Sequence, residues 1–342
     1  LNPYAYADGN PLMATDPLGL ILFAFDGTYN GYPPRGRDDI SNVRKFFESY
    51  AGTDKWYVTG VGVDDPGSGI RTNRTDMLTG NTAQARVDYM MEQLDRYADG
   101  QIGKAIDIDI VGYSRGAATA LNFVNRIAGL EAMDYWFKRG VCINLRFLGL
   151  WEVVAQFGVN GADNRSWSLG VPSAVKVAYH AIALNEHRTL FPVERPIGSM
   201  VIERGFIGSH ADVGGGNAEG DLSDVSLIWM AKMARDSGVE MSDLPEKYLS
   251  VSMPLLHDRN DPAGDRLVRT RNERGVAVRT DIQRAAQIAG MSWNDSLRFI
   301  RSFSRPRLDA DGTRSIVGEI DMEAYANWLE GEYGVSVKLD VR

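Results

Sequence analysis

The sequence has few of the residues on which several common chemistries depend. Its 342 residues include one cysteine, Cys142, so an internal disulfide and a zinc site built on several cysteines are both excluded. Because Cys142 lies in an apolar stretch, we expect a lone buried thiol in a strand. Only four histidines are available for imidazole chemistry, namely His180, His187, His210 and His257.

Positive charge and long apolar runs are also scarce. The net charge of −8 argues against a general nucleic-acid binder, which would carry a basic face. The best apolar run, 18–25, is far shorter than the roughly 18 residues that span a bilayer, so no transmembrane helix is expected. Neither a basic segment nor a long apolar stretch follows Leu1, so we expect no signal peptide. We interpret the chain as a piece of a larger protein.

What the sequence does contain is an alternation of apolar strands and amphipathic helices. This order is typical of an α/β fold, here an α/β-hydrolase-like, mostly parallel sheet with helices on both faces, followed by a mixed C-terminal extension. Strands are expected at 21–25, 55–63, 105–111, 141–151 and 200–207. Helices are expected from Asp38 or Asp39 to Phe47 and at 81–97, 117–127, 173–185 and 222–235. Functional loops should then lie at the carboxyl ends of the strands.

A nucleophile motif stands directly after the strand expected at 105–111. Gly112-Tyr113-Ser114-Arg115-Gly116 fits G-x-S-x-G, and the helix expected at 117–127 follows at once. A strained strand-to-helix turn lifts a serine hydroxyl above the sheet edge, and flanking glycines avoid a Cβ clash there. This context favours Ser114 as a nucleophile over an ordinary glycine-rich turn. The N–H of Arg115, at the start of the helix, is a candidate for the oxyanion hole.

A serine nucleophile needs a base and an acid that orients the base. His210 is the best-placed base, because it follows the strand expected at 200–207 in a glycine-rich loop, whereas His180 falls inside an expected helix. Glu152 ends the strand expected at 141–151 and gives the chain order serine, acid, histidine of α/β-hydrolases. The turn after the first strand offers the N–H of Gly27 or Thr28 as a second oxyanion donor.

Other residues remain open as alternatives. Asp26, Asp212 and His257 are candidates for catalysis or for binding an ion such as Ca²⁺. His210 and Asp212 alone are too few ligands for a metal site, so we expect no metal and no organic cofactor. Neither a P-loop nor a complete G-x-G-x-x-G motif occurs, which leaves phosphate and dinucleotide binding unsupported.

The C-terminal segment differs in charge from the rest. Residues 259–307 contain eleven arginines and five acidic residues in an otherwise acidic chain. A solvated surface is one interpretation of this segment. A patch that meets anionic lipid headgroups, or the substrate, is the other.

The first twenty residues resemble the end of the Rhs-repeat core. The family signature is Pro, four residues and Asp-Pro-x-Gly-Leu, and here Pro11 precedes Asp16, Pro17, Leu18, Gly19 and Leu20 at that spacing. In that family the core is a β-shell that encloses a C-terminal toxin and releases it by self-cleavage after the last leucine. The resemblance implies a core end at 1–20 and a released effector that starts at Ile21.

Residues 21–258 resemble the hydrolase domain of type VI secretion phospholipase effectors, with 259–342 as a C-terminal extension. The matching pieces run in the family's order: Phe25 to Thr28, Ser41 to Val43, Gly60 to Gly62, Gly112 to Ala117, Leu150 to Val154, His180 to Leu184 and His210 to Gly216. The family's triad falls on Ser114, Glu152 and His210. Two positions depart from the family pattern: Glu152 stands in place of the usual Asp, and Asn217 in place of the usual Tyr.

Together these features predict an Rhs-delivered antibacterial effector, a serine hydrolase that cleaves ester bonds of membrane glycerophospholipids. The resemblance implies four partners: a phospholipid membrane surface, a cognate immunity protein, the Rhs core shell and the secretion apparatus. It implies synthesis in the producer's cytoplasm and delivery to the envelope of a target cell. Two alternatives remain: an esterase or thioesterase for another acyl substrate, and a non-catalytic membrane-perturbing toxin that acts through the arginine-rich segment.

Overall fold

A six-stranded parallel sheet is the frame of the molecule. The computed structural model describes residues 19–31, 40–73, 75–186, 188, 191–198, 200–257 and 316–339, together with the short strand segments 270–271, 277–278 and 304–306. The strands are β1 (Gly19–Phe25), β2 (Asp54–Val58), β3 (Ala105–Tyr113), β4 (Cys142–Trp151), β5 (Val175–Ala183) and β6 (Val201–Phe206). Their order is β2-β1-β3-β4-β5-β6 and every neighbouring pair is parallel, which confirms the predicted fold class.

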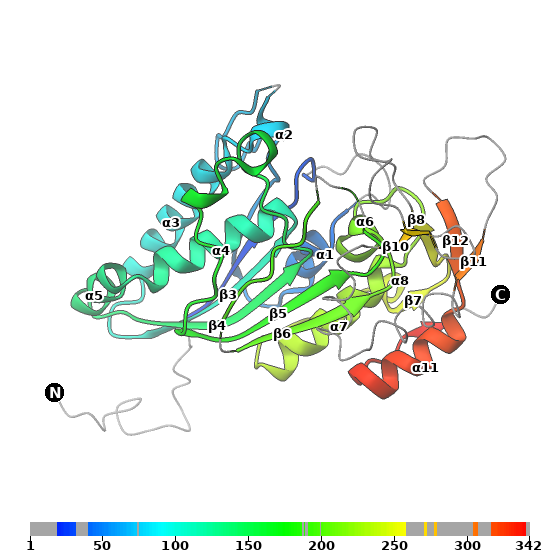
Figure 1. The fold of residues 1–342 in the computed structure, drawn as a ribbon. Helices are drawn as coiled ribbons and strands as arrows, with labels where there is room; N and C mark the ends of the chain where they lie inside the picture. The colour runs from blue at the N-terminus through cyan, green and yellow to red at the C-terminus, as the bar shows by residue number, and fades with distance from the viewer. Residues whose placement is uncertain are drawn as a thin grey trace, which may run out of the picture.

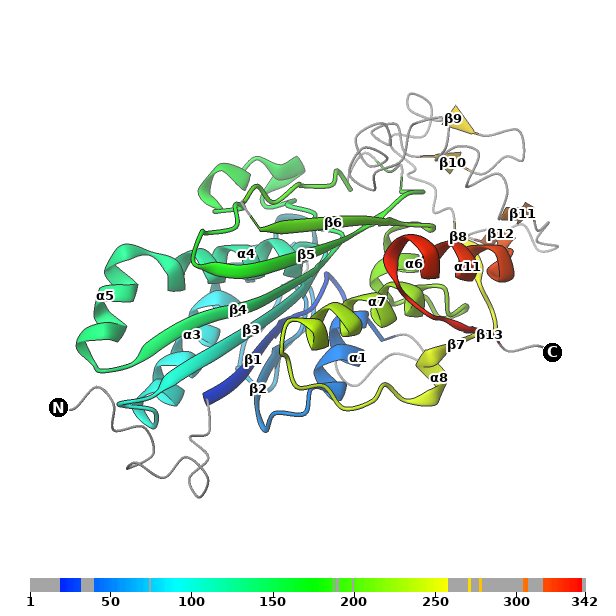
Figure 2. The ribbon, with the colours of Figure 1, turned by 90° about the horizontal axis from the view of Figure 1, so that it is seen from below.

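Helices cover both faces of the sheet. The longer ones are α1 (Asn42–Ser49), α3 (Ala83–Asp99), α4 (Arg115–Ala128), α5 (Leu130–Lys138), α7 (Ser223–Asp236) and α11 (Met322–Tyr333). The short ones are α2 (Asp76–Thr79), α6 (His210–Gly214), α8 (Glu246–Leu249) and the 3₁₀ turns Val159–Gly161 and Asn164–Ser166. Figures 1 and 2 show α3 and α4 on one face and α1 and α7 on the other.

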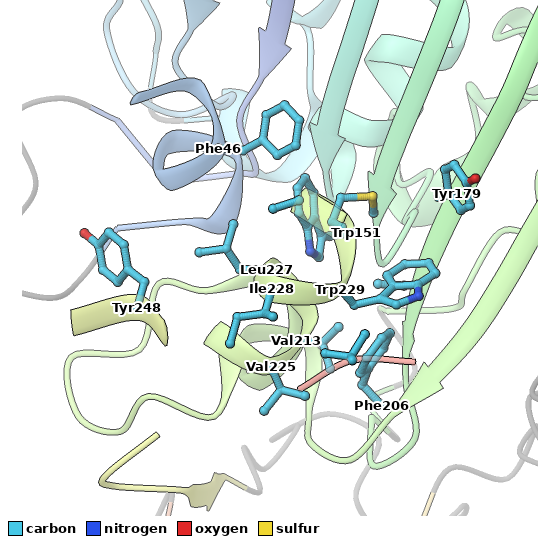
Figure 3. Close-up of a cluster of buried hydrophobic side chains, with 14 of the residues drawn as sticks. Phe46, Trp151, Tyr179, Phe206, Val213, Val225, Leu227, Ile228, Trp229 and Tyr248 are labelled. Atoms are coloured by element: carbon cyan, nitrogen blue, oxygen red, sulfur yellow. The ribbon is translucent and has the colours of Figure 1, made fainter. Parts of the chain in front are cut away.

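Each face has its own hydrophobic core. Apolar residues of α3 and α4 bury one side of β1, β3 and β4, with Phe23 packed on Phe123 at a ring distance of 4.8 Å. Figure 3 shows the opposite core, where Phe46 of α1 and residues of α7 gather around Trp151 at the end of β4. Trp151 and Trp229 are fully buried, so this core fixes the carboxyl end of β4. The candidate catalytic acid follows directly there.

Most of the expected elements are present, with shifted ends. The strand expected at 55–63 ends at Val58, because the residues beyond it turn away to pack on the loop after β1. Helix α1 begins later than expected. Its N-cap is Ser41, whose hydroxyl accepts the N–H of Arg44 at 3.1 Å, so the prediction of Asp38 or Asp39 as the start is wrong.

Two sequence predictions are wrong in kind. Residues 173–185 were expected to be a helix, but Val175–Ala183 forms strand β5 between β4 and β6. A parallel strand that is buried on both faces has a nearly continuous apolar sequence, and its alanines favour a helical interpretation. Cys142 was expected to be buried, but it is the first residue of β4, at the amino-terminal edge of the sheet, and it is exposed.

The end of the described chain packs against the sheet core. Small strands lie beyond the main sheet: β7 (Ser250–Val251), β8 (Leu255–His257), β9 (Thr270–Arg271), β10 (Ala277–Val278), β11 (Ser304–Pro306), β12 (Ile316–Ile320) and β13 (Lys338–Leu339). Tyr325 and Tyr333 of α11 hydrogen-bond the backbone of Ile207 and Gly205, next to the carboxyl end of β6. Apart from β9, β10 and β11, the arginine-rich segment 259–307 lies outside the described residues. No described helix has the length and apolar character to cross a membrane.

Candidate active site

Ser114 occupies a strained turn between β3 and α4. Its backbone has φ 56° and ψ −127°, in the region that non-glycine residues rarely adopt. The two motif glycines are required by close backbone approach. A Cβ on Gly116 would lie 2.2 Å from the carbonyl oxygen of Asp26, and one on Gly112 would lie 2.7 Å from Cα of Ala117. The turn therefore has the form of a nucleophile elbow at the carboxyl end of a central strand.

Glu152 and His210 come together at the same edge of the sheet. Glu152 follows β4 and His210 opens α6 after β6, and His210 Nδ1 lies 3.2 Å from Glu152 Oε2. Since a carboxylate only accepts, Nδ1 carries the proton in this contact. The other oxygen, Oε1, accepts the N–H of Ala183 at 2.6 Å, and Glu152 is fully buried with φ 42°. The pair that the sequence suggested is thus formed in the structure.

Tyr113 joins this pair to the serine. Its ring packs against the His210 imidazole at 4.8 Å between centroids, and its hydroxyl donates to the carbonyl oxygen of His210 at 3.2 Å. Ser114 is the next residue along the chain. No hydrogen bond links Ser114 Oγ to His210 in this structure, and among the described residues no partner occupies His210 Nε2. Such contacts are often long without substrate and tighten when it binds.

The His210 imidazole is buried, and charged groups surround it. Burial lowers the pKa of His210 below its ordinary value, while the hydrogen bond and charge of Glu152 act in the opposite direction. Arg188 lowers this pKa further and Glu186 raises it. The sequence motifs point to neither Glu186 nor Arg188. The signal for Glu186 is the strand character of β5, because Glu186 follows the carboxyl end of that strand.

The turn after β1 is organised by Asp26. The carboxylate of Asp26 accepts the N–H of Gly27 at 2.7 Å, the hydroxyl of Ser41 at 2.7 Å and the hydroxyl of Tyr57 at 2.6 Å. Burial raises the pKa of Asp26, and these hydrogen bonds oppose the rise. The N–H of Gly27 is therefore engaged, whereas that of Thr28 donates no hydrogen bond to the described residues.

Arg115 follows the serine at the start of α4. Burial lowers the pKa of the Arg115 guanidinium to about 10, and the charge of Asp76 acts in the opposite direction. The methylene stem of Arg115 runs beside Gly80, close to the ring of Phe157. A buried cation therefore lies next to the elbow on the side of α2.

Asp212 of α6 and His257 of β8 form a separate pair. Oδ1 of Asp212 lies 2.5 Å from His257 Nδ1 and accepts from Asn217 at 2.7 Å. Its Oδ2 accepts the N–H and hydroxyl of Ser209 and the N–H of His257, which closes a capping box on α6. Protein donors thus engage both carboxylate oxygens. Within the described ranges, no group of three or more His, Cys, Asp or Glu side chains is arranged to hold a metal.

His180 lies on β5, and its ring nitrogens contact Glu203 and Val153 rather than the candidate triad. Its Nδ1 lies 3.0 Å from Glu203 Oε1, and its Nε2 accepts the N–H of Val153 at 3.2 Å. His180 therefore supports the backbone that follows Glu152. His187 lies outside the described residues.

The proposed processing motif is only partly within the described chain. Asp16 and Pro17 lie outside the described residues, while Gly19 and Leu20 are the first two residues of β1. Leu20 pairs in register with Asp107 of β3. A cut after Leu20 would therefore fall inside the first strand.

Comparison with known proteins adds a family model and two folds. Residues 130–233, less than half of the chain, match the model described as T6SS, phospholipase effector Tle1-like, catalytic domain. No curated protein matches the chain. A crystal structure of an uncharacterized protein from Pseudomonas aeruginosa is 19% identical with a TM-score of 0.50; the match covers 68% of this chain and 48% of that chain, so this chain spans about half of its length.

The second solved structure is described as the Tle1 effector bound to the VgrG spike from the type 6 secretion system. It is 16% identical with a TM-score of 0.51, and the match covers 94% of each chain. At these identities the two likenesses show the fold alone. The family-model match spans α5, β4, β5, β6, α6 and most of α7, and so includes both Glu152 and His210.

Proposed function

We propose that this chain is a serine hydrolase that cleaves an ester bond of membrane phospholipids. The observation that carries the proposal is the buried Glu152–His210 pair beside the strained Ser114 turn, on carboxyl strand ends of one parallel sheet. The match of residues 130–233 to a phospholipase effector catalytic domain supports the choice of lipid as substrate.

The reaction begins at Ser114. Ser114 Oγ attacks the ester carbonyl carbon while His210 Nε2 takes the hydroxyl proton, and Glu152 holds the imidazole through Nδ1 and stabilises the imidazolium. The tetrahedral intermediate collapses to an acyl-serine, and His210 returns the proton to the leaving alcohol, a lysophospholipid. Water, activated by His210, then releases the fatty acid and restores Ser114.

The oxyanion is stabilised by two backbone donors. Thr28 takes this role rather than Gly27, because the N–H of Gly27 is held by the carboxylate of Asp26. The second donor is the N–H of Arg115, since the first N–H groups of a helix have no acceptor within that helix. In this account Asp26 shapes the turn and takes no part in proton transfer.

Delivery belongs to the same proposal. The motif at Asp16 to Leu20 supports release from an Rhs shell by cleavage after Leu20, which would leave residues 21–25 in β1. The effector would then travel with the secretion apparatus to the envelope of a target cell, and the producer would be protected by an immunity protein.

The test is Ser114→Ala assayed on phospholipid vesicles and on soluble short-chain esters. We expect fatty-acid release to fall by about 10⁶-fold, the cost of removing a serine nucleophile when the rest of the site remains. Release at the wild-type rate would reject Ser114 as the nucleophile. Wild-type hydrolysis of soluble esters with none on vesicles would support the esterase alternative. Survival of toxicity in Ser114→Ala, with loss on neutralising arginines in 259–307, would support the non-catalytic alternative.

A further inference from the structure

A second buried carboxylate fixes the backbone of the candidate base. Glu186 follows β5 by three residues, and its Oε2 accepts the N–H of His210 at 3.2 Å. The neighbouring Asn185 binds the same loop twice: its Oδ1 accepts the N–H of Gly208, and its N–H donates to the Gly208 carbonyl oxygen, both at 2.8 Å. Three hydrogen bonds from the end of β5 therefore hold residues 208–210.

The same carboxylate also reaches the imidazole ring through Arg188 and Phe191. Glu186 accepts three hydrogen bonds from Arg188: from its N–H at 2.8 Å, from Nε at 2.9 Å and from Nη2 at 2.7 Å. The Arg188 guanidinium lies 3.5 Å from the centroid of the Phe191 ring. Phe191 in turn meets the His210 ring edge-on at 4.9 Å, while Tyr113 packs on that ring at 4.8 Å. The imidazole thus contacts two aromatic rings.

Glu186 and Arg188 place opposite charges near the His210 imidazole. Burial opposes ionisation of Glu186, but Arg188 and the charge of His210 bring the pKa of Glu186 down to about 2, so the carboxylate is ionised at any working pH. The charged groups that act on His210 are Glu152 after β4, and Glu186 and Arg188 after β5. Since Glu186 and Arg188 carry opposite charges, removal of either one leaves the effect of the other on the imidazole pKa uncompensated.

We propose that Glu186, Arg188 and Phe191 form a clamp that positions the His210 imidazole, with Nδ1 on Glu152 and Nε2 open to Ser114. They are positioning residues, because they act on the ester through His210, which Glu186 binds at its N–H and Phe191 contacts at its ring. The inference rests on the proposed function, since it takes His210 as the general base. A general base must be aligned within a fraction of an ångström, and a displacement near 1 Å costs about 100-fold in rate.

Three variants separate orientation from charge. Arg188→Lys keeps the positive charge but loses the planar two-pronged contact with Glu186 and the stacking on Phe191. We expect kcat on a soluble ester to fall by about 10- to 100-fold, with KM and the acid limb of the kcat/KM–pH profile unchanged. Glu186→Gln should move this limb to lower pH, because a negative charge beside His210 is lost. Arg188→Met should move it to higher pH.

Arg146→Lys is the matched control. Arg146 is also a buried arginine that binds a carboxylate with two nitrogens, that of Asp109, at 2.9 and 2.5 Å, but it contacts the β3–β4 region rather than His210. The Arg146→Lys substitution should lower the thermal midpoint of unfolding but leave kcat and the acid limb of the kcat/KM–pH profile unchanged. The position of the limb does not depend on how much enzyme is folded, so partial misfolding cannot produce the expected opposite shifts.

The outcomes distinguish this inference from the proposed function. If Ser114→Ala and His210→Ala are inactive while all three clamp variants keep wild-type kcat and an unshifted limb, the clamp is rejected and the proposed function stands. If Arg146→Lys shifts the limb as the clamp variants do, the clamp is also rejected. If Ser114→Ala retains full activity, the proposed function itself fails. Opposite limb shifts in Glu186→Gln and Arg188→Met support the clamp.

Discussion

His210 and His180 are both buried imidazoles whose Nδ1 contacts a glutamate, but their other ring nitrogens differ. Nε2 of His180 accepts the N–H of Val153, so its hydrogen-bonding capacity is filled by the protein. Nε2 of His210 has no such partner among the described residues. Ser114 directly follows Tyr113, whose ring packs on the His210 imidazole. A carboxylate–histidine contact therefore does not identify a base. We propose His210 as the base because its Nε2, unlike that of His180, accepts no hydrogen bond from the described residues.

The two histidines also differ in what they hold. His180 lies within β5 and fixes the backbone of Val153, directly after the acid Glu152. His210 lies at the start of the short helix α6, which the Asp212 capping box and the Glu186 clamp keep in place. The His180 imidazole supports backbone within the sheet, whereas the His210 imidazole lies at the carboxyl edge of the sheet.

The largest expected difference between the two is in rate. His210→Ala should lower kcat by about 10⁶-fold, because the general base of the triad is lost. His180→Ala should lower kcat by less than about tenfold, because only the support of Val153 is removed. Steady-state hydrolysis of a soluble ester, with folding checked by circular dichroism, measures both. Equal losses in the two variants would remove the distinction drawn here.

Glu152 should give the next largest effect. Glu152→Gln should lower kcat by about 10⁴-fold, because an amide at this position favours the wrong tautomer of His210. Glu152→Asp keeps the charge but is one methylene shorter, so it should recover part of this loss. If Glu152→Gln is as active as the wild type, another acid orients the base, and the pair seen here is structural like that of His180.

The pH profile of kcat/KM should also separate the two histidines. Only neutral His210 accepts a proton from Ser114, so kcat/KM should fall on the acid side as the imidazole is protonated. Because burial lowers the pKa of His210, this limb should lie below 6.5, the ordinary value. His180→Ala should leave the limb in place. A limb at or above 6.5, or one that moves with His180, would contradict the assignment.

The smallest effect concerns stability. His180 and Arg195 hold the pKa of Glu203 below its ordinary value of 4.5, against the effect of burial. A carboxylate with a depressed folded-state pKa contributes stability above 4.5 and loses it as pH falls through the folded value. Glu203→Gln should thus lower the free energy of unfolding by about 1–3 kcal/mol at neutral pH. This deficit should shrink below pH 4.5 in urea titrations, and a deficit independent of pH would argue against the ion pair.

Sequence patterns predicted the parts of the site that depend on local order. The strand, Ser114 and the helix after it are adjacent in the chain, and Glu152 and His210 each follow an apolar strand, so all three could be named in advance. Glu186 and its clamp could not, because the alanines of β5 favour a helix, and Glu186 then has no place at a strand end. The hydrogen bond from the Gly27 N–H to Asp26 could not be predicted either, because the other partners of this carboxylate come from the N-cap of α1 and from β2.

In the proposed mechanism Ser114 is the nucleophile, and His210, not His180, activates it. A fluorophosphonate probe, followed by peptide mass spectrometry, tests this directly, since it reports covalent attack by an activated serine without a lipid interface. We predict a single adduct on Ser114 in the wild type and in His180→Ala, and none over the same time in His210→Ala. An adduct on another residue, or equally fast labelling of Ser114 in His210→Ala, would contradict the account.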